Sequence, residues 1–90
     1  MRTMLVGYDL NRPGQNYPGL YEALKAVPRW WHYLDSTWLL RTEESAAQLR
    51  DRLSPHIDAG DELLVIDVIN PEAAWSGFDQ RASQWIKDNL

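Results

Sequence analysis

The chain has 90 residues, which is enough for one domain and too few for two independent hydrophobic cores. Its net charge of −4 argues against broad non-specific binding of nucleic acid, because such binding relies on Lys and Arg to neutralise phosphates. Cysteine is absent, which excludes a disulfide framework and thiolate chemistry. No apolar run approaches the ~20 residues of a membrane span, and a strand is expected almost from Met1, so we expect a cytoplasmic protein without a membrane segment or signal peptide.

The first predicted strand, residues 3–11, is apolar and then reaches a carboxylate. Because strand side chains alternate between the two faces of a sheet, Leu5, Gly7 and Asp9 share one face. Glycine is unfavourable inside a strand, so Gly7 suggests that another group approaches the backbone there. Asp9 is therefore either part of a functional site or a hydrated strand end that caps the following turn.

A short helix is predicted after a loop over residues 11–16, which contains the turn sequence Pro13-Gly14. Asn16 is expected to cap this helix, which begins near Tyr17, and Pro28 ends it. The apolar stripe of the helix consists of Leu20, Leu24 and Val27.

Residues 29–42 are predicted to form a β-hairpin that turns near Asp35-Ser36, because they are rich in aromatic residues. A second helix follows, with Thr42 as its cap and acidic residues in its first turn. Pro55 is expected near its end. The apolar stripe of this helix consists of Leu49, Leu53 and Ile57.

Residues 62–69 are predicted to form the last strand. This segment is β-branched and almost continuously apolar, so we expect it to be largely buried. The remaining tail has helical character around Ser83, Trp85 and Ile86.

This order of elements predicts an α+β protein with the ferredoxin-like βαββαβ pattern. We expect one domain over residues 1–90, with a core over 1–70 and a C-terminal helical extension over 71–90. In that topology a four-stranded antiparallel sheet has the order 4-1-3-2 and carries both helices on one face. The other face is then open and apolar, which favours a homodimer.

Several motifs in this order resemble the CRISPR-associated protein two family and its small relatives, including virulence-associated protein D. The first strand ends in Gly7-Tyr8-Asp9-Leu10, and residues 35–43 are similar to the family's hairpin leading into the second helix. The motifs over residues 30–38 and 74–78 look closest to a SinR-like branch. The resemblance covers about residues 1–69.

The resemblance implies a homodimer in which Asp9 binds a divalent metal such as Mg²⁺ near the dimer axis and supports phosphodiester cleavage of RNA or DNA. Magnesium is a hard cation that takes one or two carboxylates plus water and phosphate oxygens, so two symmetry-related Asp9 residues suit one ion. Family members also act as non-catalytic scaffolds for nucleic acid, a role for which this Asp is dispensable. The family has several basic residues after its Tyr-Asp pair, whereas this chain offers only Arg12.

Further carboxylates are predicted near Asp9. If the last strand is antiparallel to the first, Asp61 and Glu62 lie at the same end of the sheet as Asp9, with Asp58 nearby. This group either widens a metal site or is a hydrated acidic loop. Asp67 lies inside the last strand and needs a partner such as Arg2.

The remaining polar and aromatic candidates have a structural interpretation beside a functional one. We interpret His32 as structural, because Tyr33 and Asp35 are too close in sequence to establish a partner that orients it for proton transfer. We also interpret His56 as structural, because it lies at the C-terminal end of the second predicted helix, where the helix dipole favours a cation. Arg29 and Arg41 are expected to lie near each other on the hairpin, where they and neighbouring Trp residues form either a small stacking and phosphate site or ordinary packing.

Two functions remain open at this point. The first is a Cas-like homodimer that binds nucleic acid and is either a metal-dependent endoribonuclease or DNase of antiviral defence or a non-catalytic scaffold. The second is a non-catalytic homodimeric interaction module, such as an accessory protein that binds a protein partner from the same defence or toxin–antitoxin locus.

Overall fold

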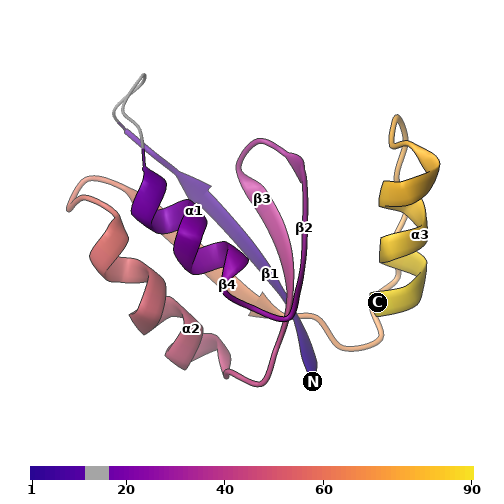
Figure 1. Cartoon of the computed structure of the whole chain (residues 1–90), viewed down its shortest axis with the longest axis horizontal. Coiled ribbons are helices and arrows are strands. Elements are labelled where there is room, and N and C mark those ends of the chain that lie inside the picture. The colour runs from indigo at the N-terminus through magenta and orange to yellow at the C-terminus, as the bar shows by residue number, and fades with distance from the viewer. Residues whose placement is uncertain (12–16) are drawn as a thin grey trace.

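The structure is a computed structural model that describes residues 1–11 and 17–90. Its strands are β1 (Arg2–Asp9), β2 (Arg29–Leu34), β3 (Thr37–Thr42) and β4 (Glu62–Asp67). Its helices are α1 (Pro18–Lys25), α2 (Ala46–Leu53) and α3 (Gln80–Asn89), with a short 3-10 turn at Ser54–His56 (Figure 1). The predicted Pro13-Gly14 turn, the cap Asn16 and the nucleic-acid candidate Arg12 lie outside the described residues.

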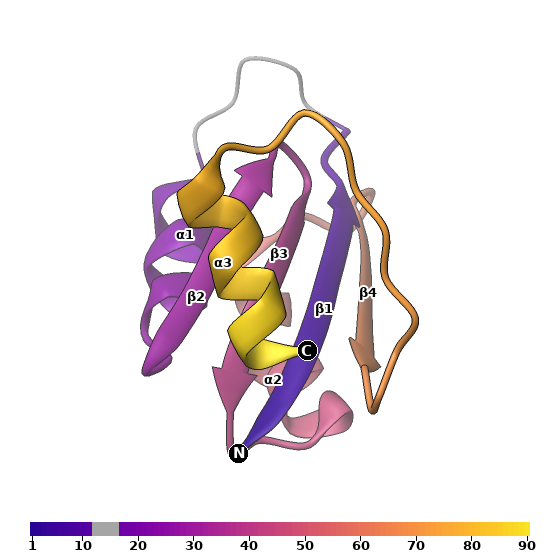
Figure 2. The ribbon, with the colours of Figure 1, turned by 90° about the vertical axis from the view of Figure 1, so that its right-hand side faces the viewer.

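The strands form one antiparallel sheet in the order β2-β3-β1-β4, so β1 is an interior strand and β2 and β4 are the edges (Figure 2). In the register, Gly7 of β1 lies between Thr37 of β3 and Leu64 of β4. The hairpin turns at Asp35-Ser36, as predicted.

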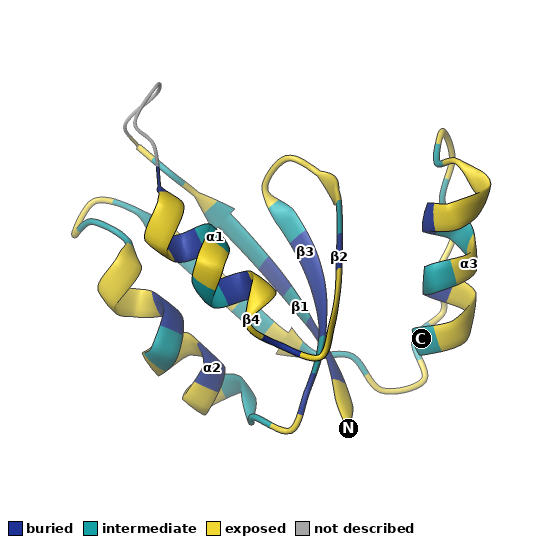
Figure 3. Ribbon diagram, viewed as in Figure 1, coloured by how far each residue is buried: buried dark blue, intermediate teal, exposed yellow. Residues whose placement is uncertain are grey.

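Helices α1 and α2 pack on one face of the sheet and bury the main hydrophobic core between the two layers (Figures 1 and 3). Leu20 and Leu24 of the predicted stripe are buried on α1, and Val27 is buried just after the helix ends. The sheet contributes Met4, Val6, Trp38 and Leu40, and α2 contributes Leu49 and Leu53. Alternation along β1 and β3 sends these sheet side chains to the same face.

Helix α3 lies on the opposite face, over the part of the sheet that contains β2 (Figure 2). Ile86 of α3 joins Trp31 of β2 and Leu39 of β3 in a second buried cluster. The indole N–H of Trp31 donates to the carbonyl oxygen of Ala82 at 3.2 Å, which fixes the helix to the strand. The expectation of an open second face is wrong for the region over β2, which the C-terminal segment covers.

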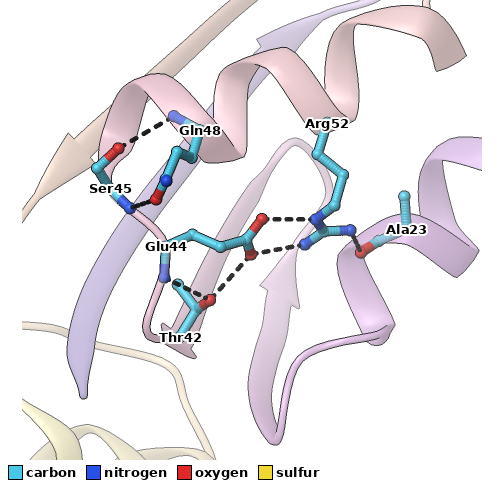
Figure 4. A network of polar contacts seen from close by, with 6 residues as sticks. All are labelled: Ala23, Thr42, Glu44, Ser45, Gln48 and Arg52. Carbon is cyan, nitrogen blue, oxygen red and sulfur yellow. Dashed lines mark hydrogen bonds and ion pairs between the residues drawn. The ribbon is translucent and has the colours of Figure 1, made fainter.

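The second helix begins later than predicted. Its cap is Ser45, whose hydroxyl accepts the N–H of Gln48 at 3.1 Å, while the Gln48 side chain accepts the N–H of Ser45 at 2.9 Å (Figure 4). These reciprocal bonds form a capping box. Thr42, the predicted cap, instead ends β3 opposite Arg2, because its backbone is held in the sheet.

A polar network joins this helix start to α1. The Arg52 guanidinium donates to both carboxylate oxygens of Glu44, at 2.7 and 3.0 Å, and to the carbonyl oxygen of Ala23 at 2.6 Å (Figure 4). The Thr42 hydroxyl donates to the same carboxylate at 2.9 Å. The hydrogen bonds from Arg52 hold the pKa of Glu44 below its ordinary value.

Strand β4 is shorter and more exposed than predicted. It ends at Asp67, and its burial alternates along its length. Leu63 and Val65 pack against the main core, whereas Leu64 and Ile66 point away from it and are 57% and 43% exposed. A largely buried strand was the wrong expectation because β4 is an edge strand and Leu64 and Ile66 are left uncovered.

None of the helices in the described part of the chain has the length and apolar character needed to cross a lipid bilayer.

Candidate functional site

Asp9 lies at the end of β1, exposed, and directly opposite Glu62 of β4. Gly7 and Leu64 are the neighbouring pair on the same face. These residues line an open hollow of about 280 Å³ at the edge of the sheet. The expectation that Glu62 lies beside Asp9 is confirmed.

The hollow owes part of its depth to Gly7. A Cβ atom on Gly7 would lie 4.0 Å from the Ser36 carbonyl oxygen, which is an ordinary van der Waals distance. The described part of the chain therefore has no close contact at Gly7 that would require glycine, and the effect of glycine is to leave the space beside Asp9 open.

The loop carboxylate Asp61 lies at this end of the sheet, as predicted, but it has a structural role. Its two oxygens accept the backbone N–H of Asn11 and the backbone N–H of Asp58, both at 2.8 Å. Asp61 thereby ties the end of β1 to the turn before β4. This leaves Asp9 and Glu62 as the carboxylates that line the hollow.

This pair fits a divalent ion as a partial ligand set. In residues 1–11 and 17–90, no three His, Asp or Glu side chains are grouped in a way that would hold a metal ion by themselves. Magnesium needs only one or two carboxylates when water and phosphate oxygens complete its shell. Asp9 and Glu62 together meet that requirement.

Tyr8, the neighbour of Asp9, faces the main core and stabilises the hairpin. Its hydroxyl accepts the indole N–H of buried Trp38 at 3.0 Å and donates to the carbonyl oxygen of Asp35 at 3.1 Å. Burial raises the pKa of Tyr8. The hydroxyl is thus committed to two internal bonds and is a structural group.

The two histidines have structural environments, as interpreted from the sequence. His32 stacks on Trp38, with ring centroids 3.7 Å apart, and its Nε2 is 3.0 Å from the carbonyl oxygen of Asp35. His56 packs so closely against Gly19 that a Cβ there would lie 2.8 Å from the His56 Nδ1. The predicted partner of Asp67 is also present, since Arg2 lies 3.7 Å from it.

Arg29 and Arg41 lie opposite each other on β2 and β3, as expected. Arg41, however, pairs with Thr3 in the sheet register and donates to its hydroxyl at 2.8 Å. Thr3 and Asp9 are at opposite ends of β1, about 20 Å apart at the usual rise of a strand. The arginine pair and the carboxylate pair are therefore separate sites.

A groove that the sequence did not reveal lies between β2 and α3, which we call the β2–α3 groove. It has a volume of about 630 Å³ and is lined by Arg29, Trp30, His32 and Tyr33 of β2 and by Arg81 and Trp85 of α3. The spacing of Arg81 and Trp85, one helical turn apart, is the sequence signal for their shared face. Their contact with β2 depends on how α3 docks, which no local pattern predicts.

Comparisons of the chain with protein-family models, with curated proteins and with solved structures find no match.

Proposed function

We propose that this chain is a homodimeric Cas-like protein of ferredoxin-like fold that cleaves RNA or DNA with a divalent metal held by Asp9 and Glu62. The observation that carries the proposal is the direct opposition of these two carboxylates on the face of the sheet that carries exposed Leu64. The strand order supports the fold, because read from the β4 edge it is β4-β1-β3-β2.

A second copy of the chain suits the uncovered side of the sheet. Leu64 and Ile66 are large apolar side chains exposed beside the carboxylate pair, and exposed apolar patches mark interaction surfaces. A two-fold axis near this surface would place a second carboxylate pair close to the first.

The chemistry assigned to the chain's own residues is simple. Asp9 and Glu62 would hold the cation through their carboxylate oxygens, and Gly7 leaves room beside them for a phosphate group. A bound Mg²⁺ would neutralise phosphate charge and lower the pKa of a coordinated water.

The test is a cleavage assay with labelled single-stranded RNA and duplex DNA in Mg²⁺. We expect Asp9→Asn to reduce the rate by about 100-fold or more, because a lost ligand removes several kcal/mol of charge stabilisation. Glu62→Gln should act in the same direction. Glu22→Gln, which changes an exposed carboxylate on α1, is the matched control and should leave the rate unchanged. Equal inertness of wild type and Asp9→Asn contradicts the proposal.

A non-catalytic interaction module, such as an accessory protein of a defence or toxin–antitoxin locus, is the second candidate. It is favoured by the exposure of Leu64 and Ile66, large apolar side chains that suit contact with a protein partner. Salt-dependent binding of nucleic acid without cleavage would support a scaffold. Absence of both binding and cleavage would support a protein partner.

A further inference from the structure

We propose that the β2–α3 groove is a binding site for single-stranded nucleic acid. This inference rests on the proposed function in that both concern nucleic acid, but the site is distinct from Asp9 and is tested separately. Three observations support it. Within the described part of the chain, two tryptophans of the groove have indole N–H groups without an acceptor, two of its arginines have no ion pair, and its net charge is positive.

The tryptophans of the chain differ in whether their indole N–H groups have a hydrogen-bond acceptor within the protein. Those of Trp31, Trp38 and Trp75 donate to Ala82, Tyr8 and Ser83, respectively. Trp30 and Trp85 line the groove, and neither indole has an acceptor among the described residues. Trp30 is also 41% exposed. A partly exposed indole with a free donor suits a ligand that presents both a ring and an acceptor.

The described arginines also differ in whether they have a hydrogen-bond or ion-pair partner. Each arginine outside the groove that the structure describes has a polar partner: Arg2 with Asp67, Arg41 with Thr3, Arg50 with Asp51 and Arg52 with Glu44. Arg29 and Arg81, which line the groove, have no hydrogen bond or ion pair within residues 1–11 and 17–90. Unpaired guanidinium groups are available to bind phosphate.

The local charge of the groove is opposite to that of the whole chain. Arg29 and Arg81 are the charged residues among those that line the groove, and no described Asp or Glu lines it. In a chain of net charge −4, these two arginines give the groove a local positive charge that would hold a phosphate backbone.

The aromatic rings favour a single strand over a duplex. Tyr33 of β2 and Trp85 of α3 line the groove from the α3 side of the sheet, and Tyr33 is 44% exposed. Trp30, which pairs with the core residue Leu40, lines the groove from across the β2 edge. Proteins that bind single strands combine cationic grooves with aromatic side chains on which unpaired bases stack. A duplex keeps its bases stacked on each other and cannot use these rings.

The experiment measures fluorescence anisotropy of a labelled eight-nucleotide oligo(dT) or oligo(U) in EDTA, where no metal-dependent cleavage occurs. Wild type should bind, and a duplex of equal length should bind at least about 10-fold more weakly. The double variant Arg29→Gln/Arg81→Gln should flatten the slope of log affinity against log salt by about 1.4, which is the value for two single-strand phosphate contacts. Tyr33→Leu should weaken binding roughly 5-fold or more.

The matched control is Arg50→Gln/Lys87→Gln, which removes the same charge from exposed positions outside the groove. It should leave the salt slope within about 0.3 of wild type. The proposal is overturned if wild type does not bind, if the control and the groove variant behave alike, or if a polyglutamate peptide binds as tightly as the oligonucleotide. Asp9→Asn should bind like wild type, which separates this result from a failure of the proposed nuclease.

Discussion

Glu44 is a single side chain on which three segments of the chain depend. Its carboxylate receives two hydrogen bonds from Arg52 of α2 and one from Thr42 of β3, and Arg52 reaches the end of α1 through Ala23. A bidentate guanidinium–carboxylate pair has a fixed geometry, so this contact orients the helices as well as joining them.

Glu44→Gln should destabilise the fold by about 1–2 kcal/mol at neutral pH, because it removes charge-assisted hydrogen bonds at a partly exposed site. The pKa of Glu44 is lower in the folded state than its ordinary value of 4.5. The stabilisation is therefore complete above pH 4.5 and is lost as the pH falls through the folded-state pKa. Urea unfolding of both proteins from about pH 7 to about pH 3 should show the difference shrinking.

Glu43→Gln is the control for this experiment, because the neighbouring Glu43 side chain is 81% exposed. It should have little effect at any pH. A destabilisation by Glu44→Gln that stays constant down to the lowest pH would show that the ionised carboxylate is not the stabilising group.

At the residue scale, the sequence correctly predicted neighbouring residues where strand pairing alone determines which residues lie side by side. The proximity of Asp9 to Glu62, and of Arg29 to Arg41, follows from antiparallel order alone. The cap of α2 was misassigned because Thr42 and Ser45 are both favourable caps. Pairing of Thr42 with Arg2 keeps Thr42 in the sheet, and Ser45 therefore caps the helix.

At the scale of elements, α3 is the part of the fold that sequence reasoning located but did not place. Its helical character was predicted, while its docking on Trp31 and Leu39 was not. A ten-residue helix presents a local periodicity, but the sheet face that receives it is determined by tertiary packing. The β2–α3 groove was missed for the same reason.

Ile86→Ala tests how much the packing of α3 on the sheet contributes to the stability of the fold. Ile86 is only 5% exposed in the second cluster, so its truncation should cost about 2–4 kcal/mol in the free energy of unfolding. Lys87→Ala, on the exposed side of the same helix, should change it by less than about 0.5 kcal/mol. Chemical denaturation followed by near-UV circular dichroism measures both. Equal effects of the two substitutions would mean that α3 is not packed on the sheet.

At the scale of the whole molecule, the two edges of the sheet differ in how they are protected. The β2 edge lies beside α3, whereas β4 carries exposed Leu64 and Ile66. Strand β4 contains no Lys or Pro, the residues that commonly prevent pairing with another chain. The β4 side is therefore the expected location of a second copy.

Leu64→Lys should weaken the proposed dimer, because it replaces an apolar contact with a charged side chain that must be desolvated at the interface. We expect the dimer dissociation constant to rise at least about 10-fold in sedimentation velocity measurements over a range of concentrations. Ala26→Lys, an exposed position at the end of α1, introduces the same charge away from β4 and should leave the dimer intact. A wild-type protein that stays monomeric at about 100 μM would refute the homodimer.

The placement of Trp38 in the main core and of Trp31 in the second cluster has a practical consequence. The main core and the second cluster each contain a buried tryptophan, and the two indole rings lie on opposite sides of the sheet. A single-tryptophan variant that retains either ring would report the loosening of one layer independently of the other. Partial unfolding that releases the C-terminal helix would then be optically distinct from loss of the helical pair.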